Sequence, residues 1–134
     1  MNDPFNDTHE MQTSGPIERD PNGIDPHSAG AKLDAGKVEP ELIQRGFARA
    51  LLAVAEVGTY GATKYTRDGW QDVQDGVRRY TNAMYRHLSA EHRGEQCDPD
   101  TKLMHAAHAA WNALARLELM LREKEAEGRE ARHD

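Results

Sequence analysis

The stretch from Arg86 to Asn112, RHLSAEHRGEQCDPDTKLMHAAHAAWN, decides how the chain is organised. Gly94 and Pro99 bound a polar turn within it, because neither residue continues a helix well. The residues before the turn read as the end of one helix, and Thr101 is a suitable N-cap for the next. The stretch therefore predicts two helices joined by a short acidic connection.

The same stretch concentrates groups that bind cations or transfer protons. On the second predicted helix, His105, His108 and Asn112 fall at positions i, i+3 and i+7, so they share one face beside an apolar stripe. Such histidines either form hydrogen bonds at the edge of the core or ligate a metal, and the pattern leaves both readings open. The histidines and carboxylates gathered in this stretch are His87, His92, His105, His108, Glu91, Glu95, Asp98 and Asp100, with the single cysteine Cys97 among them.

Composition limits the class of protein. A chain of 134 residues with a net charge of −6 is one small domain, and the acidic balance disfavours binding to a nucleic-acid polymer. One cysteine excludes an internal disulfide framework and fits a reducing cytoplasm, and no apolar run is long enough to cross a membrane. Aromatic residues make up only 6%, so we expect an Ala-, Leu- and Val-rich core completed in a homo-oligomer, a dimer or tetramer.

The sequence divides into three parts. Residues 1–29 are polar, rich in Asp, Pro, Gly and Ser, and predict a flexible tail. Residues 30–122 carry the apolar periodicity of a helical domain, and residues 123–134 read as the charged, solvated end of the last helix. The periodicity predicts an all-α bundle of three main helices at about 39–65, 72–93 and 101–127, with Asp72 capping the second.

Two other features are candidates for substrate binding. The pattern Gly30-x-Lys32-x-Asp34-x-Gly36-Lys37 places two lysines in a glycine-containing turn, where they could meet phosphate oxygens or simply be solvated. Trp70, in the polar loop after the first helix, is either an anchor on the core or a surface on which a base stacks. Neither feature identifies a ligand alone.

Four motifs together resemble one phage family, the dATP/dGTP diphosphohydrolase N-terminal domain, which is similar to the all-α MazG-type nucleotide pyrophosphohydrolases. The resemblance covers about residues 30–120. Its motifs are Gly30-x-Lys32-x-Asp34-x-Gly36-Lys37, Glu56-Val57-xxx-Gly61-Ala62-x-Lys64-Tyr65, Arg86-His87, and Gly94-Glu95-xx-Asp98 followed by His105-xx-His108-Ala109.

The resemblance implies Mg²⁺-dependent hydrolysis of a deoxynucleoside triphosphate to the monophosphate and pyrophosphate, in the nucleotide pool of a phage within the host cytoplasm. MazG-type enzymes hold Mg²⁺ with ExxE and ExxD pairs; Glu95-x-x-Asp98 matches the second, whereas Glu56 is followed three residues later by Thr59. The alternative function is a catalytically silent protein that sequesters a nucleotide. The expected metal ligands, for Mg²⁺ or Mn²⁺, are Glu56, Glu95, Asp98 and His108; the expected catalytic residues are Glu95, Asp98 and His87; and the expected substrate-binding residues are Lys32, Asp34, Lys37, Lys64, Tyr65, Trp70, Arg86, His105 and Asn112.

Overall fold

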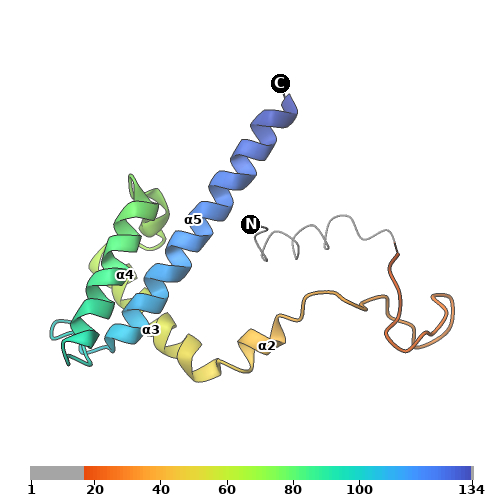
Figure 1. Cartoon of the computed structure of the whole chain (residues 1–134), viewed down its shortest axis with the longest axis horizontal. Helices are drawn as coiled ribbons and strands as arrows, with labels where there is room; N and C mark the ends of the chain where they lie inside the picture. Colours follow the sequence, from red (N-terminus) through yellow and green to blue (C-terminus); the bar gives the residue numbers. More distant parts are fainter. Residues whose placement is uncertain (1–16, 134) are drawn as a thin grey trace. The chain divides into compact units, whose positions relative to one another are not determined.

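The computed structural model describes residues 17–133, and its regular structure there is entirely helical, without a β-strand (Figure 1). The all-α prediction with three main helices is therefore confirmed. The chain divides after Gly46 into two compact units, which are described separately. The elements are α2 (Glu41–Gln44), α3 (Ala48–Lys64), the 3₁₀ helix η1 (Gly69–Asp72), α4 (Gly76–His92) and α5 (His105–His133).

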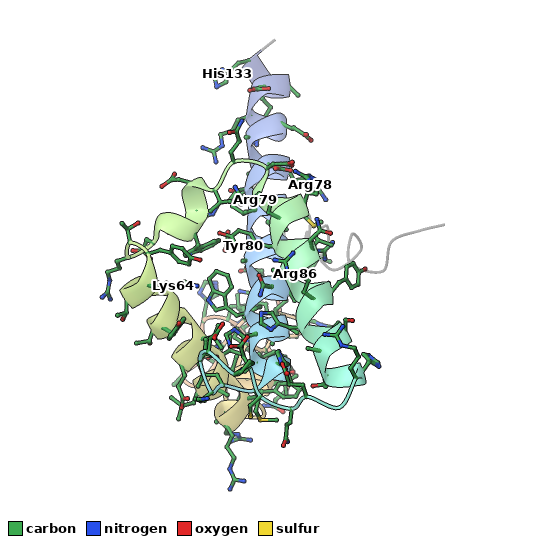
Figure 2. The ribbon with its side chains drawn as sticks, turned by 90° about the vertical axis from the view of Figure 1, so that its left-hand side faces the viewer. Lys64, Arg78, Arg79, Tyr80, Arg86 and His133 are labelled. Atoms are coloured by element: carbon green, nitrogen blue, oxygen red, sulfur yellow. The ribbon has the colours of Figure 1, made fainter. Side chains whose placement is uncertain are left out.

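In the second unit, α5 lies between α3 and α4 and packs most extensively on α4 (Figure 2). The contacts are made by small residues, since the buried apolar side chains of the described residues are Val57, Ala90, Ala107, Ala109 and Ala115. At Gly76, the first residue of α4, an added Cβ would lie 2.7 Å from Leu119 Cδ1. Alanine and glycine at these positions let the helix backbones approach closely, as the composition predicted.

An aromatic cluster of Trp70, Tyr80 and Trp111 joins the helices near η1. The ring of Trp111 meets those of Trp70 and Tyr80 edge to face, with centroids 6.0 and 5.6 Å apart. The Tyr80 hydroxyl donates a hydrogen bond to the Trp70 carbonyl oxygen over 2.7 Å. On α3, an added Cβ at Gly58 would lie 3.2 Å from Trp111 Nε1, so α3 also packs against this cluster.

The first predicted helix is wrong in its continuity. The apolar repeat predicts one helix over residues 39–65, but the structure has the single turn α2, then a break at residues 45–47, then α3. A Cβ at Gly46 would clash with the Leu42 carbonyl oxygen, and Phe47 has φ −111° and ψ 30°. Periodicity alone does not detect such a break, because Ile43 and Phe47 still fall four positions apart.

The other two helices begin later than predicted. Asp72 is the last residue of η1 rather than the cap of α4, and Asp75 precedes α4 in the left-handed conformation with φ 58°. The third helix begins at His105 instead of capping on Thr101, since residues 93–104 form a folded loop. It continues to His133, beyond the predicted end at residue 127, and its last turns are solvent-exposed with the ion pair Arg129–Glu125.

The first unit is organised by Asp20. Its carboxylate accepts hydrogen bonds from the N–H groups of Asn22, Ile24 and Lys32 over 2.7, 3.4 and 2.9 Å. These bonds tie residues 20–24, within the segment expected to be a tail, to the start of the lysine-containing turn. Residues 1–16 of that expected tail lie outside the described residues.

No helix in residues 17–133 is long and apolar enough to cross a membrane.

Candidate functional site

The loop of residues 93–104 folds back on itself and places its polar residues beside the start of α5. The N–H of Asp98 donates to the Leu103 carbonyl oxygen and that of Lys102 to the Asp98 carbonyl oxygen, both over 2.8 Å. The N–H of His105 donates to Gln96 over 2.9 Å, which satisfies one of the free donors at the helix start. The reversal uses positive φ angles at Gly94 and Lys102. It brings Glu95 and Asp98 close to the first turn of α5.

The carboxylate of Asp98 is fixed by its own loop. Its Oδ1 atom accepts the N–H groups of Asp100 and Thr101 over 2.8 and 3.0 Å. Burial opposes ionisation of Asp98, yet the backbone N–H groups of Thr101 and Asp100 bring its pKa below the usual value. Asp98 is therefore ionised and fixed in position by its loop. Both hydrogen bonds are made to Oδ1, so the Oδ2 atom remains available to another partner.

A hydrogen-bonded chain links Glu95, His105 and His87. Glu95 Oε1 lies 2.7 Å from His105 Nε2, and His105 Nδ1 lies 2.8 Å from His87 Nδ1. A carboxylate only accepts hydrogen bonds, so Nε2–H of His105 is the donor. When His105 is neutral, its Nδ1 must then accept a hydrogen bond from Nδ1–H of His87. One proton lies between the two rings.

His108 packs on the opposite side of His87. The two rings are stacked, 4.4 Å apart and within 6° of parallel, and His108 Nε2 lies 2.7 Å from the Thr101 hydroxyl. Asn112 donates from Nδ2 to the His108 carbonyl oxygen over 2.8 Å. His105, His108 and Asn112 are 3%, 7% and 6% exposed, so the polar face of α5 is buried rather than aligned along an open cleft.

Burial controls the charge of these histidines. It lowers the pKa of His87 to about 4, and the neighbouring His108 and His105 rings act in the same direction. Burial also lowers the pKa of His108, although Asp98 opposes this. Both rings are therefore neutral at physiological pH and keep a nitrogen lone pair.

Among the described residues, one set of side chains could hold a metal ion. His87, Asp98 and His105 each offer a ligand atom, and the three atoms lie within 4.8 Å of one another. Mg²⁺ prefers near-octahedral oxygen ligands, whereas two of these three donors are nitrogen. The set does not fit a magnesium ion held by the protein alone. It does fit borderline transition metals.

The remaining predicted residues of the second unit lie apart from this set. Glu56 is exposed on α3 and is not a member of the three-residue set. Trp70 is half-buried in the aromatic cluster, with Arg122 stacked over its ring. Lys64 lies over the Tyr65 ring at the end of α3, and Arg86 is exposed on α4, where Figure 2 also labels Arg78 and Arg79. The structure thus brings together His87, Glu95, Asp98, His105 and His108 of the expected set, and Asn112 bonds to the His108 carbonyl oxygen.

The lysine-containing turn belongs to the first unit. Lys37 Nζ lies 3.2 Å from Glu18 Oε1, and both side chains are more than half exposed. The N–H of Lys37 donates to the Asp34 carbonyl oxygen, and that of Asp34 to the Lys32 carbonyl oxygen. The side chain of Lys32 remains exposed.

Thr101 is a site residue that the sequence did not identify. Its hydroxyl accepts the N–H of Leu103 over 3.2 Å and is the partner of His108 Nε2. The only available signal was that a threonine precedes the helix, and this indicated an N-cap instead. The role depends on the loop path, which periodicity does not describe.

Comparison with known proteins gives two matches. The family described as "dATP/dGTP diphosphohydrolase, N-terminal" matches residues 27–129. A protein named "dATP/dGTP diphosphohydrolase", from Salmonella phage PMBT28, is 37% identical over 81 residues, which are 60% of this chain and 26% of that protein. The chain therefore spans about a quarter of the length of this relative. No solved structure matches the chain.

Proposed function

Because the chain belongs to the family of dATP/dGTP diphosphohydrolase N-terminal domains, we propose that it hydrolyses a purine deoxynucleoside triphosphate to the monophosphate and pyrophosphate. The proposed site is the cluster of His87, Glu95, Asp98 and His105. One observation supports this location above all: two ring nitrogens, 2.8 Å apart, adjoin a held carboxylate and a second carboxylate, Glu95. Groups that accept protons therefore lie together here and are positioned by hydrogen bonds.

In this proposal the oxygen of a water molecule attacks the α-phosphorus. The bond from that phosphorus to the oxygen bridging to the β-phosphate breaks, and pyrophosphate leaves with that oxygen. The proton of the water passes to a carboxylate of the cluster. Glu95 suits this role, because its side chain is half exposed and its Oε1 atom is positioned by His105. Asp98 and His87 line the site beside the reacting water.

The triphosphate carries several negative charges, and the chain is acidic overall. In the second unit, which carries the proposed site, the exposed cations expected to meet phosphate are Lys64 and Arg86. Arginine can bind a phosphate with two parallel N–H bonds, whereas lysine acts as a point charge. Trp70 is packed in the aromatic cluster, so we do not assign it a base-stacking role.

The named relative is about four times longer than the matched segment, so the activity of the whole relative need not lie in this segment. The test therefore uses the purified chain by itself. Purified protein is incubated with dATP, dGTP, dCTP and dTTP in the presence of divalent cations, and products are separated by anion-exchange chromatography. We expect a purine monophosphate and pyrophosphate in equal amounts. Asp98→Asn and Glu95→Gln should each lower kcat by about 100-fold or more.

Glu91→Gln is the matched control, since Glu91 is an exposed carboxylate on α4 outside the cluster. Asparagine at position 98 can still accept the N–H groups of Asp100 and Thr101, so the loop should stay folded. Circular dichroism checks this. Wild-type turnover by both cluster variants would contradict the location of the site. Tight nucleotide binding with no turnover would instead favour the sequestering function.

A further inference from the structure

We propose that His87, Asp98 and His105 bind a single borderline transition-metal ion, of the class of Mn²⁺, Fe²⁺, Co²⁺ and Zn²⁺, in preference to Mg²⁺. The three ligand atoms come from α4, from the loop and from the first residue of α5, and they already lie within 4.8 Å of one another. Two imidazoles and one carboxylate form a donor set that such metals accept readily. The inference disfavours the Mg²⁺ that the sequence resemblance implied and retains Mn²⁺, and Asp98 is the one expected ligand that it keeps.

The spacing of the two histidines supports this inference. Their Nδ1 atoms are 2.8 Å apart and share one proton. Two nitrogens bound to one metal at about 2.1 Å lie about 3.0 Å apart at an octahedral angle and about 3.4 Å apart at a tetrahedral one. A metal can therefore take the place of the shared proton after the two nitrogens separate by roughly 0.2–0.6 Å. Binding requires the other neutral tautomer of His87, in which the proton is on Nε2 and Nδ1 is free to ligate the metal.

The third ligand is also prepared for a cation. The backbone N–H groups of Asp100 and Thr101 both donate to Oδ1 of Asp98, which fixes the carboxylate and leaves Oδ2 for the metal. These bonds are made within one short loop, so the position of Asp98 is fixed without any metal. A fixed carboxylate loses little conformational entropy when it binds an ion.

The surroundings match those of metal-bound histidines. Histidine ligands commonly donate their second N–H to a carboxylate, which orients the ring and strengthens its basicity. Here His105 is 3% exposed and its Nε2 lies 2.7 Å from Glu95. His87 is held by the parallel ring of His108, which in turn is bonded to Thr101. Glu95 and His108 are thus supports for the ligands rather than ligands, in contrast to the roles expected from the sequence.

Three protein ligands leave coordination positions for water or for a phosphate oxygen. This step rests on the proposed function, since only a hydrolase or a phosphate-binding protein would use those positions. The metal site itself does not depend on it. It can be measured without a nucleotide, so a failure of the hydrolysis assay and a failure of metal binding are separate results.

The experiment measures metal binding to the full chain, purified without a histidine tag and treated with a chelator. Co²⁺ is titrated while its visible absorption is recorded, and Zn²⁺, Mn²⁺ and Mg²⁺ are titrated by calorimetry. We expect one tight equivalent of Co²⁺ and of Zn²⁺. Mg²⁺ should bind at least about tenfold more weakly, because nitrogen donors suit it poorly.

Substitutions distinguish the proposed metal ligands from the residues that position those ligands. His87→Gln and Asp98→Asn should abolish the tight equivalent, whereas Glu95→Gln should weaken it by about 10- to 100-fold. His92→Gln is the matched control, since His92 is an exposed histidine on the same helix as His87. Circular dichroism on each variant confirms folding, and Asp98→Asn keeps its loop bonds. Equal binding of Mg²⁺ and Co²⁺, no tight equivalent in the wild type, or wild-type binding by both ligand variants would overturn the proposal.

Discussion

The Nδ1 atoms of His87 and His105 lie 2.8 Å apart, although 18 positions separate the two residues in the sequence. The loop between them reverses the chain, so that the end of α4 meets the first residue of α5. Two imidazoles at this distance cannot both be protonated on the facing nitrogens. Burial of His87 beside the rings of His108 and His105 lowers its pKa, and this has a measurable consequence for stability.

We expect the chelator-treated protein to lose stability as the pH falls from about 6.5 to about 4. The pKa of His87 is about 4 in the folded chain, against 6.5 for an unperturbed histidine, so the unfolded chain binds more protons between these values. The stability that the neutral His87 ring contributes is thus fully present above pH 6.5 and is lost as the pH falls towards 4. Between pH 7 and pH 5 the free energy of unfolding should fall by roughly 1–2 kcal/mol from this residue.

Urea denaturation at the two pH values measures the change. The His87→Gln variant should show a smaller pH dependence, because one titrating group is removed. Its remaining slope reflects His108, whose pKa is also lowered. His92→Gln, the exposed control, should retain the wild-type slope. An unchanged slope in His87→Gln would contradict the assignment.

Two glycines of α3 should respond in opposite ways to alanine. Nothing lies within 4 Å of a Cβ at Gly61, so Gly61→Ala should raise the free energy of unfolding by about 0.5–1 kcal/mol through helix propensity. At Gly58 the new methyl group would lie 3.2 Å from Trp111 Nε1. We expect Gly58→Ala to lose that gain or become destabilising, by up to about 1–3 kcal/mol. Thermal melts of the two variants measure this difference. Equal gains in stability for both variants would show that α3 does not pack on Trp111.

A second copy of the chain should cover the exposed leucines of α5. Leu114, Leu117 and Leu121 fall on one face of the helix and are each about half exposed, at 51%, 50% and 47%. We therefore expect a dimer or tetramer in light scattering at micromolar concentration, and Leu117→Glu should lower the measured mass. Tyr85→Glu, at an exposed aromatic residue on α4, is the control and should leave the mass unchanged. A monomeric wild type would contradict the prediction.

Lysine substitutions test the first unit. Lys37→Ala should weaken binding of a nucleoside triphosphate if this cation meets phosphate, and Lys32→Ala should act in the same direction. Glu18→Gln removes only the ion-pair partner of Lys37 and should not weaken binding. Fluorescence anisotropy with a labelled nucleotide measures all three. Unchanged affinity in both lysine variants would identify the segment as a solvated turn.

Sequence periodicity was sufficient for the fold class, because apolar residues recur at helical spacing along residues 48–64, 76–92 and 105–122, within the three long helices. The family resemblance was also confirmed. Periodicity placed His105, His108 and Asn112 on one face beside an apolar stripe. It did not predict that the polar trio is buried while the leucines next to it, Leu114 and Leu117, are half exposed. Hydrogen bonds from the loop stabilise His105 and His108, and Asn112 bonds to the His108 carbonyl oxygen. Helical spacing does not predict these bonds.

The sequence predicted residues of the site, but not how those residues are arranged. His87, Glu95, Asp98 and His105 were all candidates, but which atoms meet depends on how residues 93–104 reverse direction. That path is set by left-handed Lys102 and by the hydrogen bonds of Asp98, neither of which has a periodic signature. Glu56 was grouped with the site by motif resemblance, and the structure leaves it exposed on α3.

The last prediction concerns Thr101, whose hydroxyl bonds to His108 Nε2 over 2.7 Å and accepts the N–H of Leu103 over 3.2 Å. Thr101→Val keeps the volume but leaves a ring nitrogen of buried His108 without its partner, so the free energy of unfolding should fall by about 1–3 kcal/mol. Thr101→Ser retains the hydroxyl and should cost less than Thr101→Val. Urea denaturation compares the two variants. If they are equally stable, the hydroxyl contributes nothing, and His108 must be held by its stacking on His87 alone.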